Sequence, residues 1–76
     1  MEEILKTVIE NLVDNKEEIS IEQVENDNVI TLKVKVAQDE MGKVIGKQGK
    51  VAQSIKSLMR AVGGKEQKKV EVEFVD

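Results

Sequence analysis

The chain of 76 residues contains no cysteine and no histidine. Without cysteine it can form neither a disulfide nor a thiolate metal site. Without histidine it lacks the commonest metal ligand and the usual general base at neutral pH. A domain this short also has a thin core, which disfavours a deep, enclosed active site. We therefore expect no metal, no cofactor and no enzymatic activity.

Long apolar runs are missing as well. No apolar stretch approaches the length of a membrane-spanning helix, and the N-terminus is charged and amphipathic, unlike a signal peptide. A length of 76 residues allows one domain at most. The sequence therefore predicts a single domain over residues 1–76, without a membrane segment and located in the cytoplasm.

Net charge is small and negative, at −3, but the charges are unevenly distributed. Most acidic residues fall within residues 1–40, whereas residues 41–65 contain no acidic residue at all. The basic residues of that second segment are Lys43, Lys47, Lys50, Lys56, Arg60 and Lys65. Because a local field steers a ligand more than net charge does, this segment could attract an anion despite the overall acidity.

Hydrophobic periodicity predicts the first half of the fold. Residues 2–14 carry an apolar stripe at helical spacing, and residues 18–24 and 29–37 read as strands. The second strand alternates most clearly, with one face apolar and the other bearing Lys33 and Lys35. The Asn26-Asp27-Asn28 turn signal between the strands favours an antiparallel hairpin.

Two helices and a last strand follow. Asp39 is the expected N-cap of a short helix, Glu40 to Ile45, which Gly46 interrupts. A longer helix should begin near Gly49 and stop at the Gly63-Gly64 pair. The predicted core stripe of that helix is Val51, Ile55, Leu58, Met59 and Val62. Residues 70–74 alternate again and read as a half-buried strand.

The predicted order is therefore α-β-β-α-α-β, an α+β fold. The two helices between the second and third strands form a crossover long enough for those strands to pair in parallel. We expect a three-stranded mixed sheet with the helices packed on one face.

The stretch GKVIGKQGK, residues 42–50, is the part of the chain that predicts chemistry. A glycine-rich turn leading into a helix is a common phosphate-binding device, because glycine allows close approach and the helix start offers N–H groups. Its spacing does not match the dinucleotide-binding fingerprint G-x-G-x-x-G. It does not match a Walker A loop either, which needs four residues between its glycines and Ser or Thr after the lysine. The motif that remains is G-x-x-G, Gly46 to Gly49, between two short helices.

In this context the motif resembles that of the KH domain family of single-strand nucleic-acid binders. The resemblance rests on Val44-Ile45-Gly46-Lys47-Gln48-Gly49-Lys50 and on the apolar positions of the helix that follows. The element order resembles the bacterial, type II arrangement, over the whole chain. Its size makes it most similar to the small single-domain RNA-binding proteins of the KhpA family.

A KH module grips about four nucleotides, with its GXXG loop clamping the backbone. The resemblance implies that Gly46 and Gly49 let phosphates approach, while Lys47 supplies charge and Gln48 is the second variable position. Lys43 and Lys50 would add to the local potential, and bases would lie against Ile45 and Val51. Phe74 is the one aromatic residue, which argues against RRM or cold-shock folds because these stack bases on aromatic side chains.

Each of these residues also has a purely structural explanation. Gly46 and Gly49 could end one helix and begin the next in a tightly packed corner. Ile45 and Val51 could belong to the core rather than to a binding surface. Lys56 and Arg60 lie opposite the apolar stripe of their helix and read as mostly solvated.

The leading hypothesis is a non-catalytic single-stranded RNA-binding protein that acts as a small post-transcriptional regulator or RNA chaperone. The alternative is a KH-fold interaction or dimerisation module with little RNA affinity of its own. A lone module with a short site binds weakly, and joining modules strengthens binding. The family resemblance accordingly implies a homodimer and a multidomain RNA-binding partner of the KhpB (Jag) type. The exposed face of the long helix around Ala61 and a sheet edge are both candidate interfaces.

Overall fold

The computed structural model describes residues 1–75 and contains the predicted elements in the predicted order. Its strands are β1 (Ser20–Asn26), β2 (Val29–Lys35) and β3 (Lys69–Phe74). Its helices are α1 (Glu2–Glu10), α2 (Met41–Ile45) and α3 (Lys50–Lys65), with short 3-10 turns η1 (Lys16–Glu18), η2 (Gln38–Glu40) and η3 (Lys47–Gly49). The α+β fold class and its element order are thereby confirmed.

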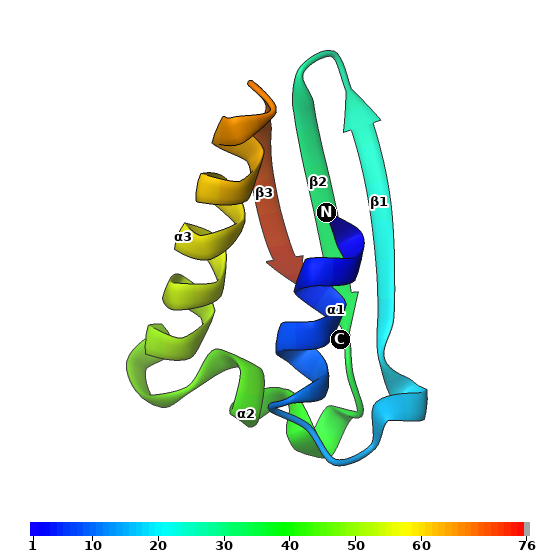
Figure 1. Ribbon diagram of the computed structural model, residues 1–76. Helices are drawn as coiled ribbons and strands as arrows, with labels where there is room; N and C mark the ends of the chain where they lie inside the picture. Colours follow the sequence, from blue (N-terminus) through cyan, green and yellow to red (C-terminus); the bar gives the residue numbers. More distant parts are fainter. Residues whose placement is uncertain (76) are drawn as a thin grey trace.

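The sheet has the order β1-β2-β3, with β1 antiparallel to β2 and β2 parallel to β3. Asp27 and Asn28 form the hairpin loop between Asn26 and Val29, and Asp27 adopts a positive φ of 56°. In the parallel pair, Leu32 lies opposite Val72. Figure 1 shows α1 and α3 lying against the same face of this mixed sheet, as the alternation of β2 predicts.

The core lies between that face and the helices. Helices α1, α2 and α3 and strand β2 all contribute residues with no exposed surface: Leu5, Ile9, Leu32, Val34, Val44 and Met59. Complete burial of one such aliphatic side chain contributes about 1.5–3 kcal/mol. Strand β1 contributes no buried residue, whereas β3, the other outer strand, contributes Val70 and Val72. The alternation of β2 in the sequence correctly predicts a strand with one buried face.

Helix α1 ends at Glu10, earlier than the predicted limit of residue 14. The side-chain amide of Asn11 donates a hydrogen bond of 2.8 Å to the carbonyl oxygen of Thr7, at the end of the helix. The chain then turns, and the N–H groups of Asp14 and Asn15 donate to the buried carboxylate of Glu40. The carboxylate of Glu40 therefore accepts two main-chain hydrogen bonds that carbonyl oxygens of α1 would have accepted if the helix had continued to residue 15.

The prediction that Gly63-Gly64 stops the long helix is wrong. Helix α3 runs through both glycines to Lys65 and ends in a Schellman motif, in which the Lys68 N–H donates to the Gly63 carbonyl and the Gln67 N–H to that of Gly64. Gln67, with φ at 59°, occupies the left-handed position that glycine usually takes. Gly63 instead allows close packing, since a Cβ there would lie 2.3 Å from Val70 Cγ2.

Two smaller predictions are also wrong. Asp39 is not an N-cap; it lies inside η2, and no side chain caps α2. Leu58 is not a core residue, because its side chain is 42% exposed, whereas Ile55 and Met59 from the same predicted stripe are buried. Leu58 lies at the edge of the apolar stripe, where its side chain stays partly in solvent.

Candidate functional site

The predicted G-x-x-G motif forms a tight corner between α2 and α3. Gly46, Gln48 and Gly49 all have positive φ angles, of 77°, 58° and 74°. That region is nearly free of cost for glycine but costs other residues roughly 1–2 kcal/mol, so Gln48 holds a strained backbone. Strain of this kind is retained when the surrounding structure or a function requires the conformation.

The two glycines are needed for different reasons. A Cβ on Gly46 would lie 2.4 Å from Val51 Cγ2, so the structural explanation for this glycine, a tightly packed corner, holds. A Cβ on Gly49 would meet no atom within 4 Å. The outer end of the loop therefore faces open space, where another molecule can approach the main chain closely.

The main-chain N–H groups of the corner are partly used within the turn. Gly49 N–H donates to the Gly46 carbonyl at 3.2 Å, and Lys50 N–H donates to the Lys47 carbonyl. Helix α3 begins at Lys50 with no side-chain cap. The first turn of α3 contains no acidic residue, so no side chain of that turn neutralises the positive end of the helix dipole.

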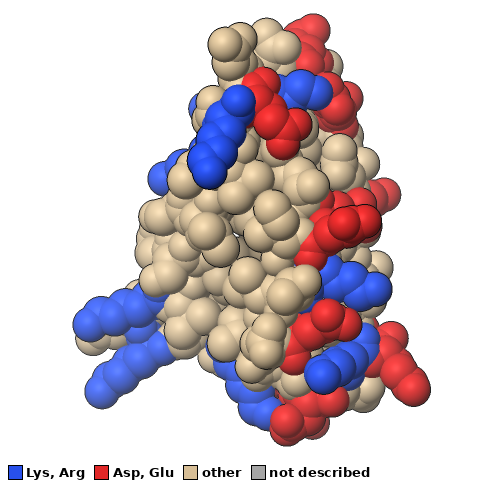
Figure 2. Space-filling view, in the orientation of Figure 1, with Lys and Arg blue, Asp and Glu red and all other residues tan. Residues whose placement is uncertain are grey.

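The charge at this corner is positive. Lys47, Gln48 and Lys50 are exposed, and within residues 1–75 neither lysine forms an ion pair. In Figure 2, basic side chains project from the corner where Figure 1 places the α2–α3 connection, and the acidic side chains visible in this view lie toward its top and its right-hand side. Ile45 and Val51 flank the loop as half-buried aliphatic residues. These predicted site residues lie together.

Lys43 lies apart from them. Its ammonium group donates to Asp14 Oδ2 at 2.9 Å and to Glu40 Oε2 at 3.2 Å, which directs it toward the segment after α1. The hydrogen bonds to Asp14 and Glu40 raise the pKa of Lys43, so it stays charged, but two carboxylates share that charge. Its contribution to the potential around the loop is correspondingly reduced.

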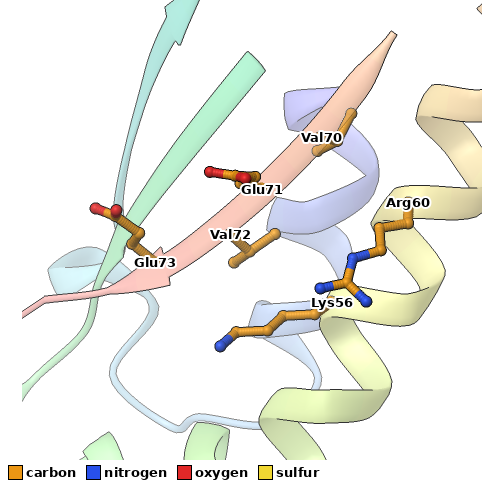
Figure 3. Close-up of a pocket in the computed structure, with 6 residues that line it drawn as sticks. All are labelled: Lys56, Arg60, Val70, Glu71, Val72 and Glu73. Carbon is orange, nitrogen blue, oxygen red and sulfur yellow. The ribbon is translucent and has the colours of Figure 1, made fainter. Parts of the chain in front are cut away.

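A second feature, which the sequence did not reveal, is a groove of about 210 Å³ between α3 and the free edge of β3. Its lining residues are Lys56, Arg60, Val70, Glu71, Val72 and Glu73. Figure 3 shows Lys56 and Arg60 reaching from α3 toward the strand. Lys56 is half-buried rather than solvated, and Arg60 is exposed.

The groove cannot be read from the sequence, because it depends on how β3 docks beside α3. The available signal was the spacing of Lys56 and Arg60, which places both on one face of a helix. Among residues 1–75 there is no group of His, Cys, Asp or Glu side chains placed to hold a metal ion. No helix within the same residues is long and apolar enough to cross a membrane.

The fold and the site together define a class of protein. The order α-β-β-α-α-β, the parallel pairing of β2 with β3 and a G-x-x-G corner between two helices characterise a KH domain of the type II arrangement. Comparison with known families identifies the particular group: the family model described as KhpA/KhpB, KH domain matches residues 2–74. The chain belongs to that family.

Several curated relatives match along their whole length. The RNA-binding protein KhpA of Listeria monocytogenes is 41% identical over 76 residues, covering all of both chains. The protein of that name from Caldanaerobacter subterraneus is 43% identical over 75 residues, covering 99% of this chain and all of the relative. The one from Aquifex aeolicus is 32% identical over 76 residues, covering all of this chain and 96% of the relative.

Proposed function

We propose that this chain is a non-catalytic protein that binds single-stranded RNA through the Gly46–Gly49 corner. The observation that carries the proposal is the open corner itself, where Gly49 faces empty space beside Lys47 and Lys50, neither of which forms an ion pair within residues 1–75. The names of its relatives, RNA-binding proteins KhpA, support the choice of RNA. In the cytoplasm such a protein would act as a small post-transcriptional regulator or RNA chaperone.

The sugar-phosphate backbone would run along the corner. Phosphates would accept hydrogen bonds from those main-chain N–H groups near Gly49 that are not already used within the turn. Lys47 and Lys50 would supply the counter-charge. The bases of about four nucleotides would then lie against Ile45 and Val51 and continue into the groove between α3 and β3. There Lys56 and Arg60 offer donors to base edges or phosphates.

The decisive variant is Lys47→Asp combined with Gln48→Asp, tested by anisotropy with a short labelled single-stranded RNA. The two new carboxylates would repel phosphate at the corner, so binding should be lost while the circular dichroism spectrum stays that of the parent. Asp tolerates a positive φ better than most residues, so position 48 need not lose its conformation.

A matched control makes the same change of charge elsewhere. Lys6→Asp with Gln67→Asp replaces one exposed lysine and one exposed glutamine that has the same positive φ as Gln48, far along the chain from the corner. This control should bind RNA nearly as the parent does. Retained binding by the Lys47/Gln48 variant, or equal loss in both variants, would show that the corner is not the binding site.

A second function, as an interaction or dimerisation module, is favoured by a different observation. The face formed by α1 and α3 carries charged side chains mainly at its margins, and its centre is uncharged (Figure 2). Ile4 on α1 and Leu58 on α3 are 43% and 42% exposed, and Ala61 on α3 is exposed as well. Such a surface suits a second copy of the chain or a KhpB-type RNA-binding partner.

Light scattering after size exclusion, with and without RNA, separates the two functions. A stable dimer that binds no RNA at low salt would favour the interaction module as the main role. In that case Leu58→Glu should convert the dimer to a monomer, because it places a charge on the uncharged face. A monomer at all concentrations that still binds RNA would exclude the second function for this chain alone.

A further inference from the structure

Glu40 is the one charged residue that is buried among residues 1–75, with 6% of its surface exposed. Burying a carboxylate is costly unless hydrogen bonds satisfy it. Glu40 Oε2 accepts from the N–H of Asp14 at 2.5 Å, and Oε1 accepts from the N–H of Asn15 at 2.9 Å. The ammonium group of Lys43, 3.2 Å from Oε2, adds an opposite charge. We call this set of contacts the Glu40 clasp.

The position of the clasp connects it to the candidate site. Glu40 immediately precedes α2, and α2 ends directly before Gly46. With 5 residues, α2 is far too short to hold a helical conformation or a direction on its own. Its buried Val44 fixes one face, and the Glu40 clasp ties its first turn to the segment that follows α1.

We propose that Glu40 is a positioning residue for RNA binding: by fastening α2 to the segment after α1, it holds the Gly46–Gly49 corner in its binding geometry. This proposal depends on the RNA-binding function proposed above. The physical reason is preorganisation. A corner already fixed in the free protein does not lose conformational entropy when RNA binds, whereas a loosened α2 would incur that cost on binding.

The contacts that the clasp makes are specific to a carboxylate. In Glu40→Gln, one side-chain oxygen is replaced by an NH2 group, which is a donor and would face a main-chain N–H donor. One of the two main-chain hydrogen bonds is then lost and a donor is left unsatisfied. The clasp should open on one side without any change in the residues of the corner itself.

Asp39→Asn is the matched control, because Asp39 is the neighbouring residue, is exposed and makes no hydrogen bond or ion pair with its side chain within residues 1–75. Both variants remove one negative charge, so any general gain in attraction for RNA is the same. Affinity for a short single-stranded RNA is measured well below the melting temperature of each variant. We expect Glu40→Gln to bind at least about fivefold more weakly than Asp39→Asn.

Nuclear magnetic resonance gives a readout that does not depend on RNA. In Glu40→Gln the amide signals of Gly46 and Gly49 should shift or broaden, while those of Leu32 and Val72 in the sheet should stay in place. Equal RNA affinity of the two variants, with unchanged glycine signals, would overturn the proposal and leave Glu40 a purely stabilising residue. If the parent protein binds no RNA, the proposed function fails, and the glycine signals still decide whether the clasp positions the corner.

A second variant covers the case in which Glu40→Gln does not fold. Asn15→Pro removes the N–H that donates to Glu40 Oε1, keeps the carboxylate and lies outside the predicted RNA site. In the structure Asn15 has a backbone φ of −90°, which is close to the range that proline adopts. We expect the same glycine signals to change and RNA affinity to fall by a smaller factor. Unchanged signals and affinity here would also contradict the proposal.

Discussion

At the scale of single residues, the G-x-x-G motif contains two glycines that look equivalent in the sequence and are not equivalent in the structure. Both adopt a positive φ, but Gly46 also packs against Val51, whereas Gly49 faces open space. The motif therefore combines Gly46, which the packing of the fold requires, with Gly49, which leaves the main chain accessible to another molecule. Sequence spacing alone cannot separate these roles, because it carries no information on what a Cβ would meet.

This difference predicts unequal losses of stability. Gly49→Ala should lower the free energy of unfolding by about 1–2 kcal/mol, the cost of a left-handed backbone for a residue with a Cβ. Gly46→Ala should cost about 1–3 kcal/mol, because a φ of 77° with a ψ of 175° is essentially restricted to glycine, and in addition about 1–3 kcal/mol for overpacking against Val51. Urea denaturation of both variants and the parent measures the difference. Equal losses would mean that the corner relaxes freely and does not pack as described.

Glu40 predicts how stability responds to acid. Hydrogen bonds from the N–H groups of Asp14 and Asn15, helped by Lys43, lower its pKa from the ordinary value of 4.5, although burial opposes them. A carboxyl whose pKa is lower in the folded state stabilises the fold above its unfolded pKa and loses that contribution as the pH falls through its folded pKa. The parent should therefore lose stability below about pH 4.5.

The test compares unfolding free energies of the parent, Glu40→Gln and Asp39→Asn between pH 7 and pH 3. In Glu40→Gln the fall with acid should be shallower, since the titrating group is gone. Asp39→Asn should follow the parent, because its side chain makes no hydrogen bond within residues 1–75. A parent-like slope in Glu40→Gln would assign the acid sensitivity to other carboxylates.

At the residue scale, the lysines of the candidate site differ in how far the sequence determines their surroundings. The exposure of Lys47, Gln48 and Lys50 agrees with their place in a glycine-rich corner between two helices. The diversion of Lys43 toward Asp14 does not follow, because these two residues lie 29 positions apart, which no local pattern encodes. Whether each of these residues contacts RNA stays a prediction.

At the scale of elements, the sequence predicted the three α-helices and three strands and their order, but their ends less well. The predicted strand 18–24 is observed as Ser20–Asn26, and 29–37 as Val29–Lys35. Periodicity reports which face of an element is buried, whereas its ends depend on caps and tertiary partners. The Gly63-Gly64 pair illustrates this point, since one glycine serves packing against β3 and the other has no such constraint.

That pair predicts opposite effects of one substitution. Gly64 lies inside α3, and a Cβ added there would meet no atom within 4 Å, so Gly64→Ala should raise the free energy of unfolding by about 0.5–1 kcal/mol through helix propensity. Gly63→Ala should lower it, because the new methyl group would lie 2.3 Å from Val70 Cγ2 and 2.8 Å from the Lys68 carbonyl oxygen. Thermal unfolding measures both. If Gly63→Ala also stabilised the protein, α3 and β3 would not be packed this closely.

At the scale of the whole molecule, an acidic protein presents a basic corner. Acidic side chains gather on the side formed by α1 and β1, while basic side chains project at the α2–α3 corner (Figure 2). The molecule is 34 Å in its longest dimension, whereas the Debye length at physiological ionic strength is about 8 Å. An RNA strand bound at the corner, as proposed, would therefore experience mainly the field of the local lysines, and the net charge of −3 would have little effect on it.

This separation predicts how RNA affinity depends on salt. With three or four phosphate contacts, each contributing a slope of about −0.7, affinity should fall about 20- to 50-fold between 50 and 200 mM salt. Lys47→Ala should make the slope shallower by about 0.7, since one contact is lost.

The matched control neutralises two exposed acids of η1 at the foot of β1. Glu17→Gln with Glu18→Gln should leave the slope unchanged and alter affinity less than about twofold at 150 mM salt. If neutralising those distant acids strengthened binding as much as Lys47→Ala weakens it, net charge rather than the corner would govern binding. A slope near zero for the parent would mean that phosphates are not what the protein holds.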